Sequence, residues 1–153
     1  MANSILYIGK RFLQGALFQP FTNIKFIRWY PPQPGVIKVN FDGSCINSVA
    51  AGGFILRDWT GKTIKVGVAN YGLSPSLVVE ARALKDGVDL AVQVGYSIIS
   101  IEGDNMIVIQ ALKDDCKGPW QIAHIIKDVK ACLHQSSWVF INHNFREANM
   151  TAD

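Results

Sequence analysis

The chain has 153 residues, of which 49% are hydrophobic and 18% charged, and its formal net charge is +3. This length and composition suit one domain with an ordinary buried core and exclude a wholly disordered chain. The three cysteines, Cys45, Cys116 and Cys132, lack C-x-x-C spacing, which argues against a disulfide framework or a zinc ribbon. No apolar run is long enough to span a membrane and no secretory signal is present, so we expect an intracellular protein of the nucleus or cytoplasm.

Residues 1–28 are basic. The first acid of the chain is Asp42, whereas five basic residues precede it: Lys10, Arg11, Lys25, Arg28 and Lys38. The stretch could be a linker, a weak contact to phosphate or an organelle transit segment. We favour a partly disordered linker, because the stretch is rich in aromatic residues and lacks a run of Ser and Arg. The prolines of WYPPQPG, residues 29–35, favour extended backbone, and we expect a single domain over residues 29–153.

The next segments predict three strands. Residues 36–42 alternate, with Ile37, Val39 and Phe41 on one face, which predicts a strand that ends at Asp42. Residues 50–57 and 63–70 are rich in β-formers and are joined by a short connection with a glycine. We therefore expect an antiparallel meander.

The pattern then changes to that of a helix. Apolar residues step by four and three over residues 76–94, and Gly95 is a typical helix stop: Leu77, Ala81, Leu84, Val88 and Ala91 form the stripe. Residues 97–105 predict a strand buried on both faces, as in a parallel sheet. Residues 105–112 and 122–133 predict helices, 138–145 a last buried strand and 147–153 the start of another helix. This order predicts a layered α/β fold.

Three acids occupy notable places on this framework. Glu80 lies on or beside the buried helical stripe, where an ionised carboxylate needs either a basic partner or another source of neutralisation. Asp42 could merely start a turn, and Asp104 could merely cap the helix that follows it. If the strand before Asp104 lies parallel to the strand of Asp42, however, both acids meet at the carboxyl edge of the sheet, within reach of Glu80. Such a cluster needs a cation, and an all-oxygen ligand set favours Mg²⁺ or Mn²⁺ over zinc.

The chain resembles the ribonuclease H superfamily, and within it the plant-type domains found alone or at the end of non-LTR retroelement polyproteins. The resemblance covers residues 29–153 and rests on six ordered motifs: W-x-P-P-x-P-G, K-V-N-F-D-G-S, A-G-G-F-I-L-R-D, E-A-R-A-L, I-E-G-D-N and H-N-F-R-E-A-N-M-T-A-D. It implies a three-layer α/β fold. Its sheet would be mixed and five-stranded, in the order 3-2-1-4-5, with helices on both faces and a truncated final helix.

The resemblance also implies an activity and its residues. Members of the family hydrolyse the RNA strand of RNA/DNA hybrids with two Mg²⁺ or Mn²⁺ ions, leaving a 5′-phosphate and a 3′-hydroxyl. The implied catalytic residues are Asp42, Glu80, Asp104, His143 and Asp153. The four acids would hold the metal ions, and His143 would shuttle a proton or aid product release. The implied contacts to the hybrid are Gly43, Ser44, Cys45, Asn47, Asn105, Arg146 and Asn149.

Two other functions stay open at this point. One is a catalytically weak or inactive nucleic-acid-binding domain, a retroelement remnant; the other is a protein-interaction module whose acids are structural. The presence of all four acids favours the nuclease, whereas a match that ends at Asp153, before the family's last helix, favours the remnant. The lysines between residues 113 and 130 are offset by nearby aspartates, which is typical of a solvated face. Affinity for a hybrid would then depend on an attached partner, such as a reverse transcriptase domain in a longer polyprotein.

Overall fold

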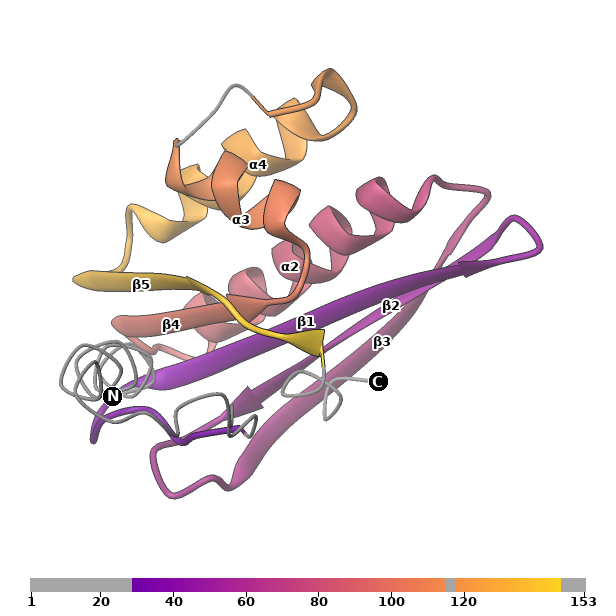
Figure 1. Cartoon of the computed structure of the whole chain (residues 1–153). Helices are drawn as coiled ribbons and strands as arrows, with labels where there is room; N and C mark the ends of the chain where they lie inside the picture. The colour runs from indigo at the N-terminus through magenta and orange to yellow at the C-terminus, as the bar shows by residue number, and fades with distance from the viewer. Residues whose placement is uncertain (1–28, 115–117, 147–153) are drawn as a thin grey trace, which may run out of the picture.

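The computed structural model describes residues 29–114 and 118–146 of the chain (Figure 1). Every strand and helix expected within these ranges is present, with ends that differ by a few residues from the prediction. The elements in chain order are β1 (Ile37–Ile46), β2 (Val49–Arg57), β3 (Thr63–Gly72), α2 (Ser76–Gln93), β4 (Ile98–Gly103), α3 (Met106–Lys113), α4 (Trp120–Leu133) and β5 (Trp138–His143).

The five strands form one mixed sheet in the order β3-β2-β1-β4-β5, as the family resemblance implied. Strands β1, β2 and β3 pair antiparallel, whereas β4 lies parallel to β1 and β5 lies parallel to β4. A two-residue turn joins β1 to β2. Both of its residues, Asn47 and Ser48, have positive φ, which is the backbone that matches the twist of a tight hairpin.

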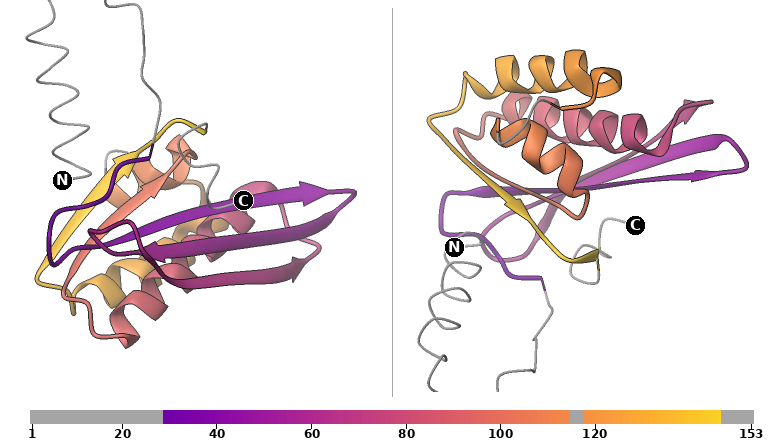
Figure 2. Two further views of the ribbon diagram at one scale, coloured as in Figure 1. Left: turned by 90° about the horizontal axis from the view of Figure 1, so that it is seen from below. Right: turned by 45° about the horizontal axis from the view of Figure 1, so that its top comes forward.

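The described helices all lie on one side of this sheet (Figures 1 and 2). Helix α2 lies directly on β1 and β2 and presents its predicted apolar stripe to them, so that Leu84 and Val88 are fully buried. Gly87 permits this close approach, because a Cβ there would lie 2.8 Å from Cγ1 of Val39. The helix expected over residues 147–153, which would begin the layer on the other side, lies outside the described residues.

Two predictions about strands were wrong. Strand β1 does not end at Asp42 but continues to Ile46, because it goes on pairing with β2 as far as the hairpin turn. Strand β5 is not buried throughout: Trp138 is 67% exposed and Phe140 36% exposed, because β5 is an edge strand of the sheet. By contrast β4, which has a parallel neighbour on each side, is almost wholly buried, as its apolar run predicted.

Candidate metal centre

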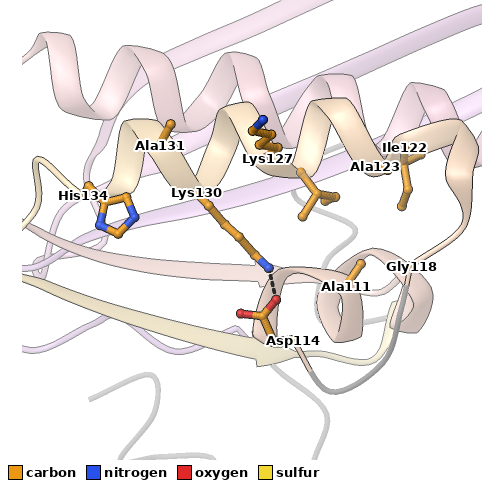
Figure 3. A pocket seen from close by; sticks show the side chains of 10 residues that line it. Ala111, Asp114, Gly118, Ile122, Ala123, Lys127, Lys130, Ala131 and His134 are labelled. Atoms are coloured by element: carbon orange, nitrogen blue, oxygen red, sulfur yellow. Dashed lines mark hydrogen bonds and ion pairs between the residues drawn. The ribbon is translucent and has the colours of Figure 1, made fainter.

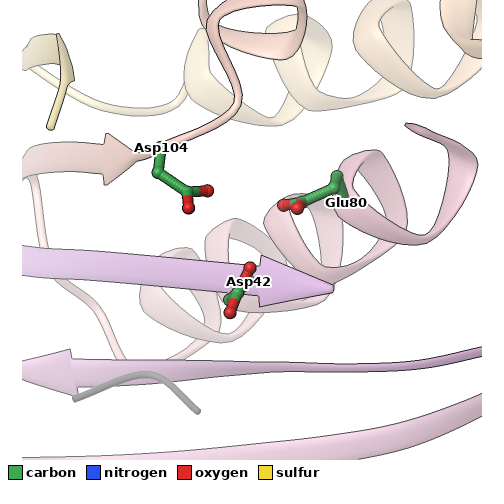
Figure 4. A group of neighbouring side chains, drawn as sticks. All are labelled: Asp42, Glu80 and Asp104. Atoms are coloured by element: carbon green, nitrogen blue, oxygen red, sulfur yellow. The ribbon is translucent and has the colours of Figure 1, made fainter. Parts of the chain in front are cut away.

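Three acidic side chains converge where β1, β4 and α2 meet (Figure 4). Asp42 comes from β1, Glu80 from the second turn of α2 and Asp104 from the residue after β4. One carboxylate oxygen from each residue lies within 4.8 Å of those of the other two. Segments separated by tens of residues in the chain therefore form one cluster, as the sequence predicted.

The register of the two parallel strands explains why Asp42 and Asp104 meet. Pairing between β1 and β4 ends at Asn40 and Glu102, and both acids stand two residues farther along their strands. Strand β1 continues beside β2 to Ile46, whereas β4 ends at Gly103. Asp42 therefore lies beside the end of β4, where β1 no longer has a neighbouring strand on that side. This is the edge of an open α/β sheet at which ligands characteristically bind.

Glu80 reaches the cluster because α2 begins in close contact with β1. A Cβ at Gly43 would lie 2.8 Å from Cγ1 of Val79 and 2.9 Å from the backbone nitrogen of Glu80. Only a residue without a side chain leaves α2 at this distance. The glycine beside Asp42 thus sets how near Glu80 comes to it.

We predict that Gly43→Ala lowers stability and weakens metal binding together. The new methyl group must push the backbone of α2 away from β1, which costs about 1–3 kcal/mol for an overpacked core and moves Glu80 away from Asp42. Thermal unfolding and a Mn²⁺ titration would measure the two effects. Gly118→Ala is a matched control, since its Cβ would crowd Ala111 at 2.8 Å, between α3 and α4. Unaltered Mn²⁺ affinity in Gly43→Ala would contradict this account.

The charge state of Glu80 reflects its surroundings. Its side chain is only 6% exposed, and burial, followed by the nearby charges of Asp42 and Asp104, raises the pKa of Glu80 to about 9. None of the ion pairs between described residues includes Glu80, so a basic partner, which the sequence left open, is not found there. Its Oε2 is buried and has no hydrogen-bond partner among the described residues. The cluster is therefore short of positive charge.

A divalent cation fits this arrangement. The donors are all carboxylate oxygens, which suit a hard ion such as Mg²⁺ or Mn²⁺ better than zinc. The unpartnered Oε2 of Glu80 supplies a lone pair that nothing else in the described structure uses. Such an ion would also remove the mutual repulsion of the three carboxylates.

The structure places two more predicted residues beside this cluster. Nε2 of His143 lies 2.9 Å from the backbone oxygen of Asp104, so the histidine adjoins the acid. Asn105 caps α3: its Oδ1 accepts hydrogen bonds from the backbone nitrogens of Ile107 and Val108 at 3.1 and 3.2 Å. The helix cap is thus Asn105 and not Asp104, which leaves the Asp104 carboxylate for the cluster.

The remaining residues that were predicted to contact a hybrid follow Asp42 in β1 and its turn, or follow β5. Gly43, Ser44 and Cys45 continue β1 beyond Asp42, and Asn47 lies in the hairpin turn; Ser44, Cys45 and Asn47 are exposed. Arg146 is exposed just after β5. Asn149 and Asp153 lie outside the described residues, and the contacts of all these side chains with a hybrid stay predictions.

Sequence reasoning missed a polar network next to the acids. Lys38 and Glu102, both almost fully buried, form an ion pair of 2.7 Å between β1 and β4. Glu102 was hidden inside an apolar run that predicted a buried strand. The alternation of side chains along the strands was the available signal. Lys38 lies on the face of β1 opposite Ile37 and Val39, and Glu102 lies on the same face of the sheet as Lys38.

A cavity of about 650 Å³ lies elsewhere, between α3 and α4 (Figure 3). Its floor is apolar, and Lys130, which forms an ion pair with Asp114, stands at its rim together with Lys127 and His134. None of the three clustered acids lines it. The cavity is therefore separate from the candidate metal centre.

None of the helices within the described ranges is long and apolar enough to cross a membrane.

Comparisons with known proteins place the chain in a family. Residues 40–153 match the family model described as "Reverse transcriptase-like". A protein of Arabidopsis thaliana named "Putative ribonuclease H protein" is 27% identical over 131 residues, which are 84% of this chain. The chain spans only about a fifth of that relative, 21% of its length.

Solved structures share the fold. The ribonuclease H1 of the archaeon Halobacterium salinarum superposes with a TM-score of 0.73 at 22% identity, covering 77% of this chain and 92% of that one. The LC11 ribonuclease H1, solved in complex with an RNA/DNA hybrid, gives a TM-score of 0.70 at 18% identity, covering 76% of this chain and 91% of that one. The chain therefore belongs to the reverse transcriptase-like family and forms a domain of the ribonuclease H superfamily.

Proposed function

We propose that this domain is a metal-dependent endonuclease that hydrolyses the RNA strand of RNA/DNA hybrids. The observation that carries the proposal is the convergence of Asp42, Glu80 and Asp104 in a ribonuclease H fold. The buried Oε2 of Glu80 lies in this cluster and has no hydrogen-bond partner among the described residues. The solved hybrid complex of the LC11 enzyme, which has the same fold, supports a hybrid as the substrate.

The acids of the chain would hold two Mg²⁺ or Mn²⁺ ions, with Asp153 as a fourth ligand. When bound, the ions would lower the pKa of a water molecule and stabilise the departing 3′-oxygen. His143, whose Nε2 lies 2.9 Å from the backbone oxygen of Asp104, would take or give a proton near the reacting phosphate. Ser44, Cys45 and Asn47 extend past the acids on the exposed end of β1 and its turn, where they can contact the hybrid backbone and its 2′-hydroxyls.

An attached domain is part of this proposal. The Arabidopsis relative is about five times as long as the segment matched here, and the family is described as reverse transcriptase-like. Positive charge on α4 is partly offset, since Lys130 pairs with Asp114. We propose that a reverse transcriptase domain in a longer parent protein adds affinity for the hybrid.

A cleavage assay tests the proposal directly. A hybrid with end-labelled RNA is incubated with the chain in EDTA, Ca²⁺, Mg²⁺ or Mn²⁺, beside double-stranded DNA and double-stranded RNA of the same sequence. We expect cleavage of the hybrid alone, only with Mg²⁺ or Mn²⁺, and products with a 5′-phosphate. A parallel preparation of Asp42→Asn controls for contaminating nuclease. Binding of the hybrid without cleavage in either metal would instead identify a non-catalytic, hybrid-binding domain.

A further inference from the structure

Glu102 connects three segments of the chain next to the candidate metal centre. Its Oε1 lies 2.7 Å from Nζ of Lys38, and its Oε2 accepts hydrogen bonds from Nδ2 of Asn40 at 3.4 Å and from Nδ2 of Asn144 at 3.3 Å. Lys38 and Asn40 belong to β1, Glu102 to β4, and Asn144 follows β5. One carboxylate thus links β1, β4 and the segment that follows β5 through side chains.

The segment before β1 closes this network from solvent. Nε1 of Trp29 donates a hydrogen bond of 2.9 Å to Oδ1 of Asn40, and the indole ring centroid lies 4.8 Å from Nζ of Lys38. The backbone oxygen of Tyr30 also accepts a hydrogen bond from Lys38. Lys38 and Glu102 are consequently only 1% and 2% exposed. Burial lowers the pKa of Lys38, and the charge of Glu102 opposes this shift.

The network lies directly before the candidate metal ligands Asp42 and Asp104 on β1 and β4. Asn40 and Glu102 form the last pair between β1 and β4, and Asp42 and Asp104 follow them by two positions. Asn144 follows His143, whose Nε2 lies 2.9 Å from the backbone oxygen of Asp104. Any slip between these three segments would therefore change the distances among Asp42, Asp104 and His143.

Stability alone does not account for such a network. Desolvating a buried ion pair costs about as much as the attraction returns, and well-packed apolar residues often serve equally well. A polar network instead fixes the relative positions of the segments that it joins, because its hydrogen bonds are satisfied in only one arrangement.

We propose that Glu102 is a positioning residue, which acts through Lys38, Asn40 and Asn144 to hold Asp42 and Asp104 at metal-binding distance. The proposal deepens the proposed function, since it assumes that these acids bind a divalent ion. Residues that orient metal ligands from behind typically affect metal affinity by about 10–100-fold.

The test compares Mn²⁺ affinities of the whole chain by isothermal titration calorimetry. We expect Glu102→Gln to bind Mn²⁺ about 10–100-fold more weakly than the unsubstituted chain. Val129→Ala, which removes buried volume from α4, is the control: it should lower the melting temperature and leave Mn²⁺ affinity unchanged.

A double variant separates positioning from stability. Lys38→Met combined with Glu102→Leu removes both buried charges, so we expect it to regain much of the melting temperature that Glu102→Gln loses. Mn²⁺ affinity should nevertheless stay low, because apolar side chains do not hold Asn40 and Asn144. If Glu102→Gln binds Mn²⁺ like Val129→Ala, or if affinity recovers in step with melting temperature, the proposal is overturned.

The outcome is distinguishable from failure of the proposed function. Mn²⁺ binding without cleavage of hybrids would reject the nuclease and still allow the comparison of affinities. If the unsubstituted chain binds no Mn²⁺, amide hydrogen exchange of the metal-free protein decides instead. Faster exchange in Glu102→Gln at residues 41–43 and 103–104, but not in α4, would support positioning, and unchanged exchange there would overturn it.

Discussion

Asp42→Asn is expected to abolish metal-dependent cleavage of RNA/DNA hybrids. Asp42 faces both other acids of the cluster, and its charge contributes more than that of Asp104 to the raised pKa of Glu80. Asparagine has nearly the same shape but lacks the charge that attracts a divalent ion. Metal ions supply several kcal/mol of transition-state stabilisation, so we expect a rate loss of about 10³-fold or more.

The fold of Asp42→Asn should be unaffected. Removing one of three adjacent carboxylates relieves repulsion, so the melting temperature of the metal-free variant should equal or exceed that of the unsubstituted chain at neutral pH. Asp128→Asn, on an exposed position of α4, is the matched control and should retain full activity. Cleavage by Asp42→Asn at a rate near that of this control would show that the clustered acids are not the catalytic site.

Glu80→Gln should remove a pH dependence of stability from the metal-free protein. The pKa of Glu80 is raised from 4.5 to about 9 in the folded chain. The folded state therefore binds more protons than the unfolded state between these values, and the free energy of unfolding falls as the pH rises through this window. Glutamine cannot ionise. At a pH of about 8.5 the metal-free variant should be more stable than the unsubstituted chain by a few kcal/mol.

Denaturant unfolding at pH values of about 5.5 and 8.5, with and without Mg²⁺, would measure this effect. The difference between variant and unsubstituted chain should be small at the lower pH and large at the higher one. Mg²⁺ should stabilise the unsubstituted chain more strongly at high pH, because it competes with the proton of Glu80. Asp128→Asn serves again as the control. Equal pH dependence in Glu80→Gln and the unsubstituted chain would show that Glu80 is ionised at neutral pH without a metal.

Local patterns in the sequence were sufficient to predict the elements and their order. Alternation placed Ile37, Val39 and Phe41 together on the apolar face of β1, and the apolar steps from Ala81 to Ala91 placed α2 on the sheet. It did not show that Lys38 and Asn40, on the opposite face, are buried as well. These predictions succeeded because the side-chain period decides which residues share a face, and the sequence shows that period directly. The acids could be predicted as a cluster because parallel strands place their carboxyl ends at one edge.

Other features depended on which segments became neighbours. The length of β1 beyond Asp42 follows from pairing with β2, and the choice of Asn105 over Asp104 as helix cap follows from where α3 begins. The ion pair between Glu102 and Lys38 likewise follows from the register of the parallel strands β1 and β4. The sequence by itself determined the order of the elements and the identity of the clustered acids. Only the tertiary structure decided that Glu102 pairs with Lys38 and that Glu80 has no basic partner among the described residues, because ion pairs join residues by distance in space and not by spacing along the chain.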